Sequence, residues 1–413
     1  MKAQSHNLHR IELQTLVVCG SIFVINSIFA QTWTRQTNAP TTDWGSIASS
    51  ADGSKLIAAT FFSAVYTSTN SGLAWTLRTV PGITFAQAVA SSADGSVLAV
   101  AAQNSFGGPI CISTNSGNTW TISSAPMFAW NSVACSADGS KIAAAAWTDG
   151  SVSYNPSLIY ISTNSGTTWT QTSAPSNFWW SVASSADGTK LVAGSYNSRS
   201  FFTSFDSGAN WTSNNLPGGP IGSRVAIVSS ADGTRLMAAC NSQYVFISTN
   251  SGSNWISKFI FVPNHPSANW SALTSSADGR RLAAISQDAP VYTSTDFGNT
   301  WTPDDVTNAP WTAIASSADG NRLVAVAQGT ILGNIYTSYS TAAPQLNLAI
   351  TSSNLAFSWT VPSTNFVLQQ NLDLMASDWV TLTNTPTLNL TNLNNEISLF
   401  PTNTSSFFRL ATP

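Results

Sequence analysis

Residues 184–211 read SSADGTKLVAGSYNSRSFFTSFDSGANW, and this stretch contains both motifs that determine the fold. The first motif is the tetrapeptide Ser-Ala-Asp-Gly, here called the aspartate turn, which occurs seven times. Its aspartates follow one another at intervals of 42, 44, 49, 45, 46 and 41 residues. They are Asp52, Asp94, Asp138, Asp187, Asp232, Asp278 and Asp319. A period of this length indicates a repeat architecture.

The second motif, Ser-x-(Asn/Asp)-x-Gly-x-x-Trp, lies between successive aspartate turns and is here called the glycine–tryptophan turn. It has six complete copies, which end at Trp75, Trp120, Trp169, Trp211, Trp255 and Trp301. Glycine permits a positive φ, and an Asn or Asp side chain caps such a turn. The segments between turns are short and rich in Val, Ile, Ala, Thr and Tyr, which predicts four strands per repeat. A four-stranded repeat of this size is typical of a propeller blade.

The seventh repeat has no glycine–tryptophan turn, and the start of the chain supplies the missing strand. Gln31-Thr32-Trp33-Thr34 matches the end of a repeat, and Trp33 precedes Trp75 by 42 residues. We therefore predict an all-β chain whose residues 31–340 form a seven-bladed β-propeller closed by the N-terminal strand. Such closure removes exposed sheet edges.

The glycine–tryptophan turns resemble the Asp-box of the BNR-repeat propellers, a group that includes sialidases, sortilin-type receptors and photosystem II assembly factors. The resemblance covers about residues 31–340 and implies an architecture rather than an activity, since these boxes are structural in all those families. Sialidases use an arginine triad and a tyrosine activated by a glutamate. Beyond residue 30 the only glutamate is Glu396, which follows the repeats. The resemblance therefore favours the non-catalytic branch.

Composition excludes several kinds of function. Only 8% of residues are charged, against about 25% in an average soluble domain, and the formal net charge of −3 argues against a nucleic-acid partner. Residues 31–413 keep three cysteines and one histidine, His265. This count excludes a multi-histidine zinc site, and we predict neither a metal site nor a cofactor.

The first 30 residues predict a secretory signal peptide. MKAQSHNLHR carries Lys2 and Arg10, an apolar stretch runs from about residue 13 to Ala30, and a small residue ends it. A lipobox at Cys19 and a retained anchor helix are the alternatives. No other stretch reaches the length needed to span a bilayer. We therefore expect a secreted or cell-surface protein, with the periplasm as a further location, and no membrane span in the mature chain.

Residues 341–413 contain a short linker and further strand patterns, which predict a small β-sandwich-like C-terminal domain. Surface attachment or export sorting is one interpretation of this domain. A cap or spacer is the other, and the sequence does not choose between them.

The candidate binding site follows from the repeat pattern. The loops between second and third strands and between blades differ among repeats, so they form the variable-loop face, where function is expected. Five of the seven positions eight residues before each turn aspartate are Trp, and Trp180 adds another. We predict that a set of residues rims the channel on this face: Trp44, Trp130, Trp179, Trp180, Arg224, Trp270 and Trp311. Packing between blades is the alternative role of these rings.

The predicted function is a monomeric, non-catalytic binding or scaffold module. Its partner would be a glycan, stacked on the rings, or an extracellular or envelope protein. The alternative is a glycoside hydrolase of sialidase type. An ordinary glycosidase would need two facing carboxylates, which loop acids could supply. These are Asp149, Asp288, Asp304 and Asp305.

Overall fold

The computed structural model is all-β in the part of the chain that it describes. That part comprises residues 32–104, 107–150, 155–196, 200–215, 217, 225–240, 244–263, 270–306, 308–329, 334–340, 344–350, 354–362, 365–373, 377–400, 406–411 and 413. Across these ranges there is no helix that could cross a bilayer. The predicted signal peptide, Cys19, Arg224 and His265 lie outside the described residues.

Within the described ranges, seven four-stranded sheets follow one another along the chain. Their first strands are β2 (Trp44–Ser49), β6 (Ala86–Ser91), β10 (Ala129–Cys135), β14 (Trp179–Ser184), β18 (Val225–Ser229), β22 (Trp270–Ser275) and β26 (Trp311–Ser316). Their second strands are β3 (Leu56–Thr60), β7 (Leu98–Ala102), β11 (Ile142–Thr148), β15 (Leu191–Ser195), β19 (Leu236–Cys240), β23 (Leu282–Ser286) and β27 (Arg322–Ala327).

The third strands are as buried as the inner two, whereas the fourth strands are short and exposed. The third strands are β4 (Val65–Ser68), β8 (Ile110–Ser113), β12 (Ile159–Ser162), β16 (Ser200–Ser204), β20 (Tyr244–Ser248), β24 (Tyr292–Ser294) and β28 (Ile335–Tyr339). The fourth strands are β5 (Thr76–Arg78), β9 (Thr121–Ile122), β13 (Thr170–Gln171), β17 (Thr212–Asn215), β21 (Ile256–Phe259), β25 (Thr302–Pro303) and β1 (Thr32–Arg35).

The first strands of neighbouring sheets contact one another all the way around the ring, and β26 returns to β2. In the last sheet the order is β1-β28-β27-β26, so the N-terminal strand pairs with the C-terminal end of the repeats. The pairing is antiparallel and runs from Thr32 opposite Tyr339 to Arg35 opposite Tyr336. The first strand therefore completes the last sheet, as the position of Trp33 in the repeat predicts.

The alanines of the aspartate turns form a second, closed ring. The amide of each alanine donates a hydrogen bond to the alanine carbonyl of the next sheet, at 2.6–2.8 Å, and Ala318 donates to Ala51 to close the circle. Their methyl groups form one apolar cluster. The members are Ala51, Ala93, Ala137, Ala186, Ala231, Ala277 and Ala318.

Each aspartate turn is also stabilised internally. At Asp187, the carboxylate accepts hydrogen bonds from the hydroxyl of Ser185 at 2.6 Å and from the amide of Thr189 at 2.9 Å. Gly188 has a φ of +67°, and a Cβ there would lie 2.7 Å from Cδ of Lys141 in the preceding sheet. The glycine is thus required both by its φ and by the close approach of a neighbouring side chain.

The repeated cations after the aspartate turns connect neighbouring sheets. Lys55 Nζ donates to the carbonyl of Asp94 at 2.8 Å, and Lys190 Nζ donates to that of Asp232 at 2.7 Å. Each contact joins a cation to the aspartate turn of the next sheet. The cations therefore link adjacent blades rather than stabilise single turns.

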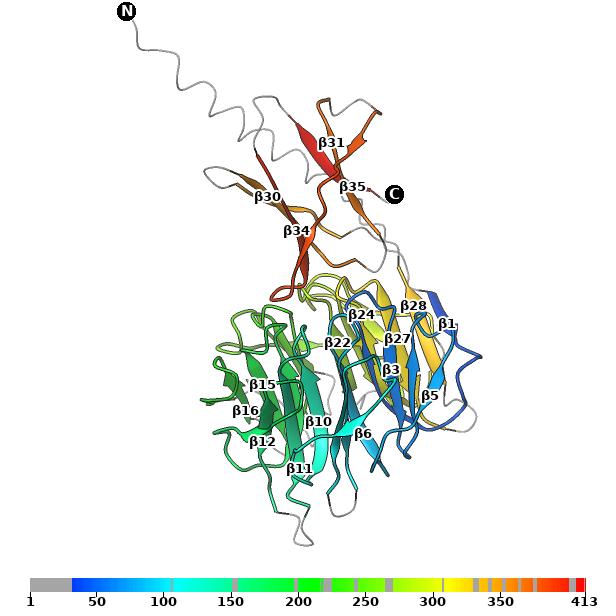
Figure 1. Cartoon of the computed structure of the whole chain (residues 1–413), viewed down its shortest axis with the longest axis vertical. Helices are drawn as coiled ribbons and strands as arrows, with labels where there is room; N and C mark the ends of the chain where they lie inside the picture. The colour runs from blue at the N-terminus through cyan, green and yellow to red at the C-terminus, as the bar shows by residue number, and fades with distance from the viewer. Residues whose placement is uncertain are drawn as a thin grey trace, which may run out of the picture.

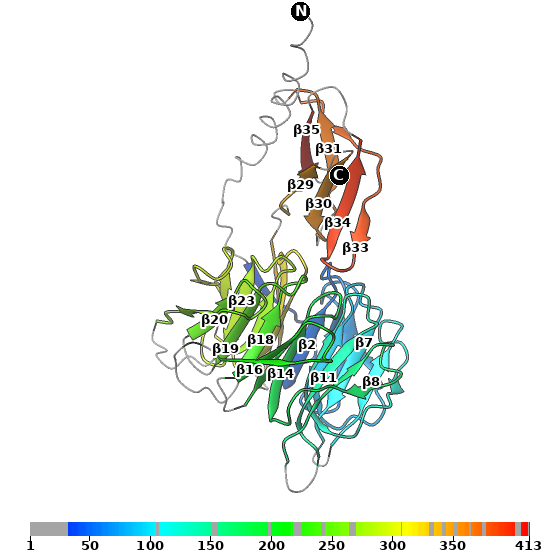
Figure 2. The same ribbon diagram turned by 90° about the vertical axis from the view of Figure 1, so that its left-hand side faces the viewer.

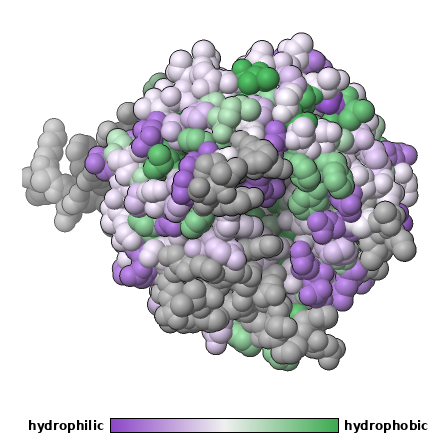
Figure 3. Space-filling model, turned by 90° about the horizontal axis from the view of Figure 1, so that it is seen from below, coloured by the Kyte–Doolittle hydropathy of each residue, from purple (hydrophilic) through white to green (hydrophobic). Residues whose placement is uncertain are grey.

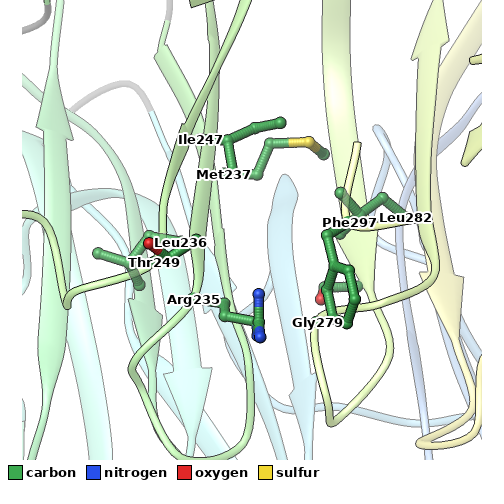
Figure 4. Close-up of a pocket in the computed structure, with 9 residues that line it drawn as sticks. Arg235, Leu236, Met237, Ile247, Thr249, Gly279, Leu282 and Phe297 are labelled. Carbon is green, nitrogen blue, oxygen red and sulfur yellow. The ribbon is translucent and has the colours of Figure 1, made fainter. Parts of the chain in front are cut away.

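Arg235 also contacts the next sheet, through an aromatic ring. Its guanidinium lies 4.0 Å from the centre of the Phe297 ring, and Figure 4 shows the two side chains facing each other across a small pocket between adjacent sheets. Phe297 occupies the position of the glycine–tryptophan turn where the other five copies have Ser with positive φ. Arg235 therefore makes a cation–π contact with the aromatic ring at a position where the other five copies have a serine hydroxyl.

A C-terminal unit of two sheets, β29–β35, stands on one end of the ring (Figures 1 and 2). One sheet contains β29 (Asn347–Ile350), β30 (Leu355–Thr360), β34 (Asn394–Leu399) and β33 (Thr387–Asn389). The other contains β32 (Val380–Thr381), β31 (Val367–Asn371) and β35 (Phe407–Ala411). The sheets share a core in which the rings of Phe357 and Phe408 are 4.5 Å apart.

The C-terminal unit contacts the ring at its alanine cluster. Val361 and Leu393, whose backbones are hydrogen-bonded to each other at 2.9 Å, pack against the seven alanines. Arg280 also donates to Gln345 at 3.3 Å. The two apolar side chains therefore cover the end of the ring on the side of the aspartate turns.

We expect the aspartate turns to lose stability in acid. Burial acts to raise the pKa of Asp187, but hydrogen bonds from Ser185 and Thr189 outweigh it and leave the pKa lowered. A lowered pKa contributes stability that is present above the unfolded pKa and lost as the pH falls through the folded value. Asp187→Asn should therefore lower the Tm at pH 7, and the difference from the parent should shrink towards pH 3, in scans by circular dichroism.

The exposed loop residue Asp288 provides the control, as Asp288→Asn. A Tm difference for Asp187→Asn that stays constant from pH 7 to pH 3 would contradict this account of the turn.

The contact of the C-terminal unit can be tested with Leu393→Asn. Leu393 has a φ of +55°, which asparagine tolerates, so the change removes the apolar side chain and retains the backbone conformation. We expect faster proteolytic release of the C-terminal unit, measured by timed digestion and mass spectrometry. Leu390→Asn, at a side chain that is 40% exposed, is the matched control. Equal cleavage rates in both variants would rule out a role for Leu393 in docking.

Candidate functional site

The variable-loop face lies at the end of the ring opposite the C-terminal unit. Backbone hydrogen bonds join the aspartate turn to the glycine–tryptophan turn within a sheet, as from Ser71 to Ser54 at 2.8 Å. Both turns therefore lie at the end that the C-terminal unit covers. The loops after the second strands and between sheets lie at the other end, which Figure 3 shows from below.

Five of the predicted rim tryptophans are fully buried. Trp44, Trp130, Trp179 and Trp311 have no exposed surface, and Trp270 is 1% exposed. Each ring packs against aromatic side chains of the same or the adjoining sheet, such as Trp311 against Tyr336 at 5.1 Å between ring centres. In this arrangement the rings present no face to a ligand, and they serve the alternative role of packing between blades.

The reason for this burial is a β-bulge. The pairing of the first and second strands shifts register directly after the tryptophan, as between Trp179 and Ser181. The tryptophan turns into the space between sheets, and the bulged residue that follows takes a different direction. In β14 that residue is Trp180, which is partly exposed. Trp180 is thus the one of the six predicted tryptophans that reaches the surface among the described residues.

Trp180 belongs to a cluster of four partly exposed aromatic side chains. Trp147 is the penultimate residue of β11 and lies edge-on to Trp180 at 5.7 Å and to Tyr196 at 4.7 Å, measured between ring centres. Phe178 lies 5.3 Å from Trp147. The carbonyl of Trp180 accepts a hydrogen bond from the side-chain amide of Asn131 at 2.5 Å. These contacts fix the rings as a rigid surface that spans two neighbouring sheets.

More exposed apolar side chains lie on loops of the first three sheets at the same end of the ring. Phe62 is 60% exposed, Phe85 is 44% exposed and their rings are 5.9 Å apart. Met127 is 55% exposed and precedes Phe128, whose carbonyl accepts from Gly108 at 2.8 Å. We call the whole set the apolar arc. It consists of Phe62, Phe85, Met127, Phe128, Trp147, Phe178, Trp180 and Tyr196.

The loop acids are partly committed to structural contacts. Asp304 accepts hydrogen bonds from Nε1 of Trp33 at 2.9 Å and from the hydroxyl of Thr293 at 2.8 Å. Burial raises the pKa of this carboxyl, and the two hydrogen bonds oppose the rise only in part. Asp43 accepts from the amide of Gly329 at 2.7 Å. Asp304 thus joins the N-terminal strand to the neighbouring sheet.

Other expected chemistry is not assembled in the described part of the chain. Within those ranges no three metal-ligating side chains of the His, Cys, Asp or Glu types gather at one place. Arg224 and His265 lie outside the described residues. The sequence pattern did not single out Phe62, Phe85, Met127 or Trp147. Their shared signal is an apolar residue at the end of a strand, where the repeats differ in length.

The fold is shared with solved structures that have little sequence in common with this chain. Streptogramin B lyase matches 75% of this chain and 97% of its own at 15% identity, with a TM-score of 0.60. YCF48 bound to D1 peptide matches 76% and 98% at 15% identity, with a TM-score of 0.57. These neighbours are β-propellers. The chain has the β-propeller fold.

A third neighbour is an enzyme of larger size. The GH74 xyloglucanase from Xanthomonas campestris matches 80% of this chain and 59% of its own at 16% identity, with a TM-score of 0.58. No protein-family model and no curated protein matches the sequence. At such identities the propeller neighbours establish the fold alone.

The two kinds of tryptophan should respond differently to substitution. Trp311→Ala removes a fully buried ring and should lower the free energy of unfolding by about 3–5 kcal/mol. Trp180→Ala removes a partly exposed ring and should cost about 1 kcal/mol. Urea denaturation followed by circular dichroism measures both. A larger loss for Trp180→Ala than for Trp311→Ala would contradict the assignment of Trp311 to the core.

Proposed function

We propose that this chain is a secreted or cell-surface seven-bladed β-propeller, closed by its N-terminal strand and followed by a small β-sandwich domain. In this proposal residues 1–30 are a signal peptide, and the propeller is a non-catalytic binding or scaffold module. Its ligand is a glycan or a protein that docks on the variable-loop face. The seven sheets between Thr32 and Tyr339 and the two-sheet C-terminal unit support this organisation.

The apolar arc is the observation that carries the proposal. Monomeric proteins seldom leave several large apolar side chains exposed together unless the surface binds something. Phe62, Phe85 and Met127 are each at least 44% exposed and lie on the face whose loops differ most among repeats. At the opposite end of the ring, Val361 and Leu393 of the C-terminal unit pack against the turn alanines.

The propeller neighbours agree with either a binding or a catalytic use of this fold. The YCF48 structure contains a bound peptide, whereas the GH74 structure is a xyloglucanase. In this chain Asp304, one of the four loop acids considered for hydrolysis, holds Trp33 and Thr293 instead of facing solvent with both oxygens free. That commitment supports binding over a sialidase-type hydrolase.

The proposal is tested by screening residues 31–413 against a glycan array and a peptide array, followed by affinity measurements on the strongest ligand. Phe85→Ser and Trp180→Ala should each weaken binding about tenfold or more, because both remove contact surface. Leu77→Ser, at an outer-strand side chain that is 60% exposed, should leave affinity unchanged and is the matched control.

Two results would contradict the proposal. One is a ligand whose affinity is the same for all three variants, since it would bind elsewhere. The other is turnover of a fluorogenic sialoside or another glycoside by the purified chain, which would establish the hydrolase alternative.

A further inference from the structure

The side chains of the apolar arc indicate which class of ligand it binds. This inference rests on the proposed binding function. Its most exposed members are Phe62, Phe85 and Met127, whose side chains have no hydrogen-bond donor and no acceptor stronger than the weakly accepting thioether of Met127. They contribute mainly apolar and ring contacts. A ligand that covers them therefore has to present apolar groups of its own.

Several polar side chains beside these residues form hydrogen bonds within the loops. The hydroxyl of Thr60 donates to the carbonyl of Phe62, and that of Thr84 donates to Asn104. The same Asn104 oxygen accepts from the amide of Phe85 at 3.2 Å. A sugar ring needs free hydroxyls or amides around its stacking surface. The hydroxyls of Thr60 and Thr84 and the side-chain oxygen of Asn104 are instead hydrogen-bonded within the loops.

The same holds next to the aromatic cluster. Asn131 donates through its amide to the carbonyl of Trp180 and accepts from Gln87 at 3.2 Å. The amide that lies closest to the exposed indole therefore holds the bulge of β14 in place. Both the amide nitrogen and the side-chain oxygen of Asn131 are therefore engaged in hydrogen bonds within the protein.

The layout of the arc favours an extended ligand. Its members come from four neighbouring sheets, beginning with the loop after β3 and ending with Tyr196 after β15. The rings of Phe62 and Phe85 are 5.9 Å apart. Alternate side chains of an extended peptide are separated by about 7 Å and point to the same side, which is close to the separation of the Phe62 and Phe85 rings.

A negative charge beside the arc also restricts the charge of the ligand. Asp149 lies two residues after Trp147, at the cluster end of the arc, and Asn155 donates to its carboxylate at 3.1 Å. The formal net charge of the chain is −3. An acidic ligand would be repelled here, whereas a lysine or arginine beyond the apolar stretch would be attracted.

We propose that the apolar arc binds an extended stretch of polypeptide with apolar side chains at alternate positions and no acidic residues. Binding is by side-chain contact across the first four sheets, with Phe62, Phe85 and Met127 as the anchors at one end. The Trp147–Trp180–Tyr196 cluster receives the other end.

The experiment is to pan a phage-displayed library of random 12-residue peptides on residues 31–413. The most enriched sequence is then synthesised and titrated by tryptophan fluorescence and calorimetry. We expect enriched peptides with alternating apolar residues and no Asp or Glu. Phe62→Ser, Phe85→Ser and Met127→Ser should each weaken the synthetic peptide about tenfold, with an unchanged Tm because the side chains are exposed.

Leu77→Ser is again the control and should bind as the parent does. The same titrations with cellohexaose and xyloglucan oligosaccharides should show no binding.

Three results would overturn the inference. Oligosaccharide binding that Trp180→Ala abolishes, without peptide binding, would leave the proposed function standing and replace the ligand class. Peptide binding that none of the three serine variants weakens would refute both the inference and the assigned face. Enrichment of acidic peptides would refute the charge selection and with it the inference.

Discussion

The circle of hydrogen bonds between the turn alanines is the constraint on which the rest of this structure depends. Each alanine amide donates to the next sheet at 2.6–2.8 Å, so every sheet is held at a fixed distance from its neighbours close to the axis. A side chain larger than alanine at these positions would crowd the axis, and a different turn would shift the donor and the acceptor. The repeated Ser-Ala-Asp-Gly sequence satisfies this geometry seven times over.

This circle also divides the molecule into two ends with different tasks. At the turn end, carboxylates and cations are consumed by turns and by contacts between sheets, and the C-terminal unit rests on the alanine methyl groups. At the other end, the described loops lie away from the circle of alanine hydrogen bonds. They can differ in length and expose apolar side chains there without disturbing closure. The division explains why so few charged residues suffice for a chain of 413 residues.

The repeat pattern predicts the sheets, their order and the return of the N-terminal strand, because turns of fixed spacing determine where each strand begins and ends. It does not predict which way a side chain points at a bulge. Trp179 and Trp180 are adjacent and of the same type, yet one is buried in the core and the other reaches the surface. The apolar arc also escapes sequence reasoning, because its members occupy different positions in different repeats and are brought together only by the ring.

The pairing of β1 with β28 has a consequence for the order of folding. Thr32 and Tyr339 are partners in one sheet, so the first strand to be synthesised finds its partner only after more than 300 further residues. Until then the first six sheets can form, each from strands close in sequence, while the axis stays open. Closure therefore carries a high entropic cost, because it joins distant segments of the chain. It also brings β26 against β2 and Ala318 against Ala51, so the two ends of the repeats meet through three sets of contacts.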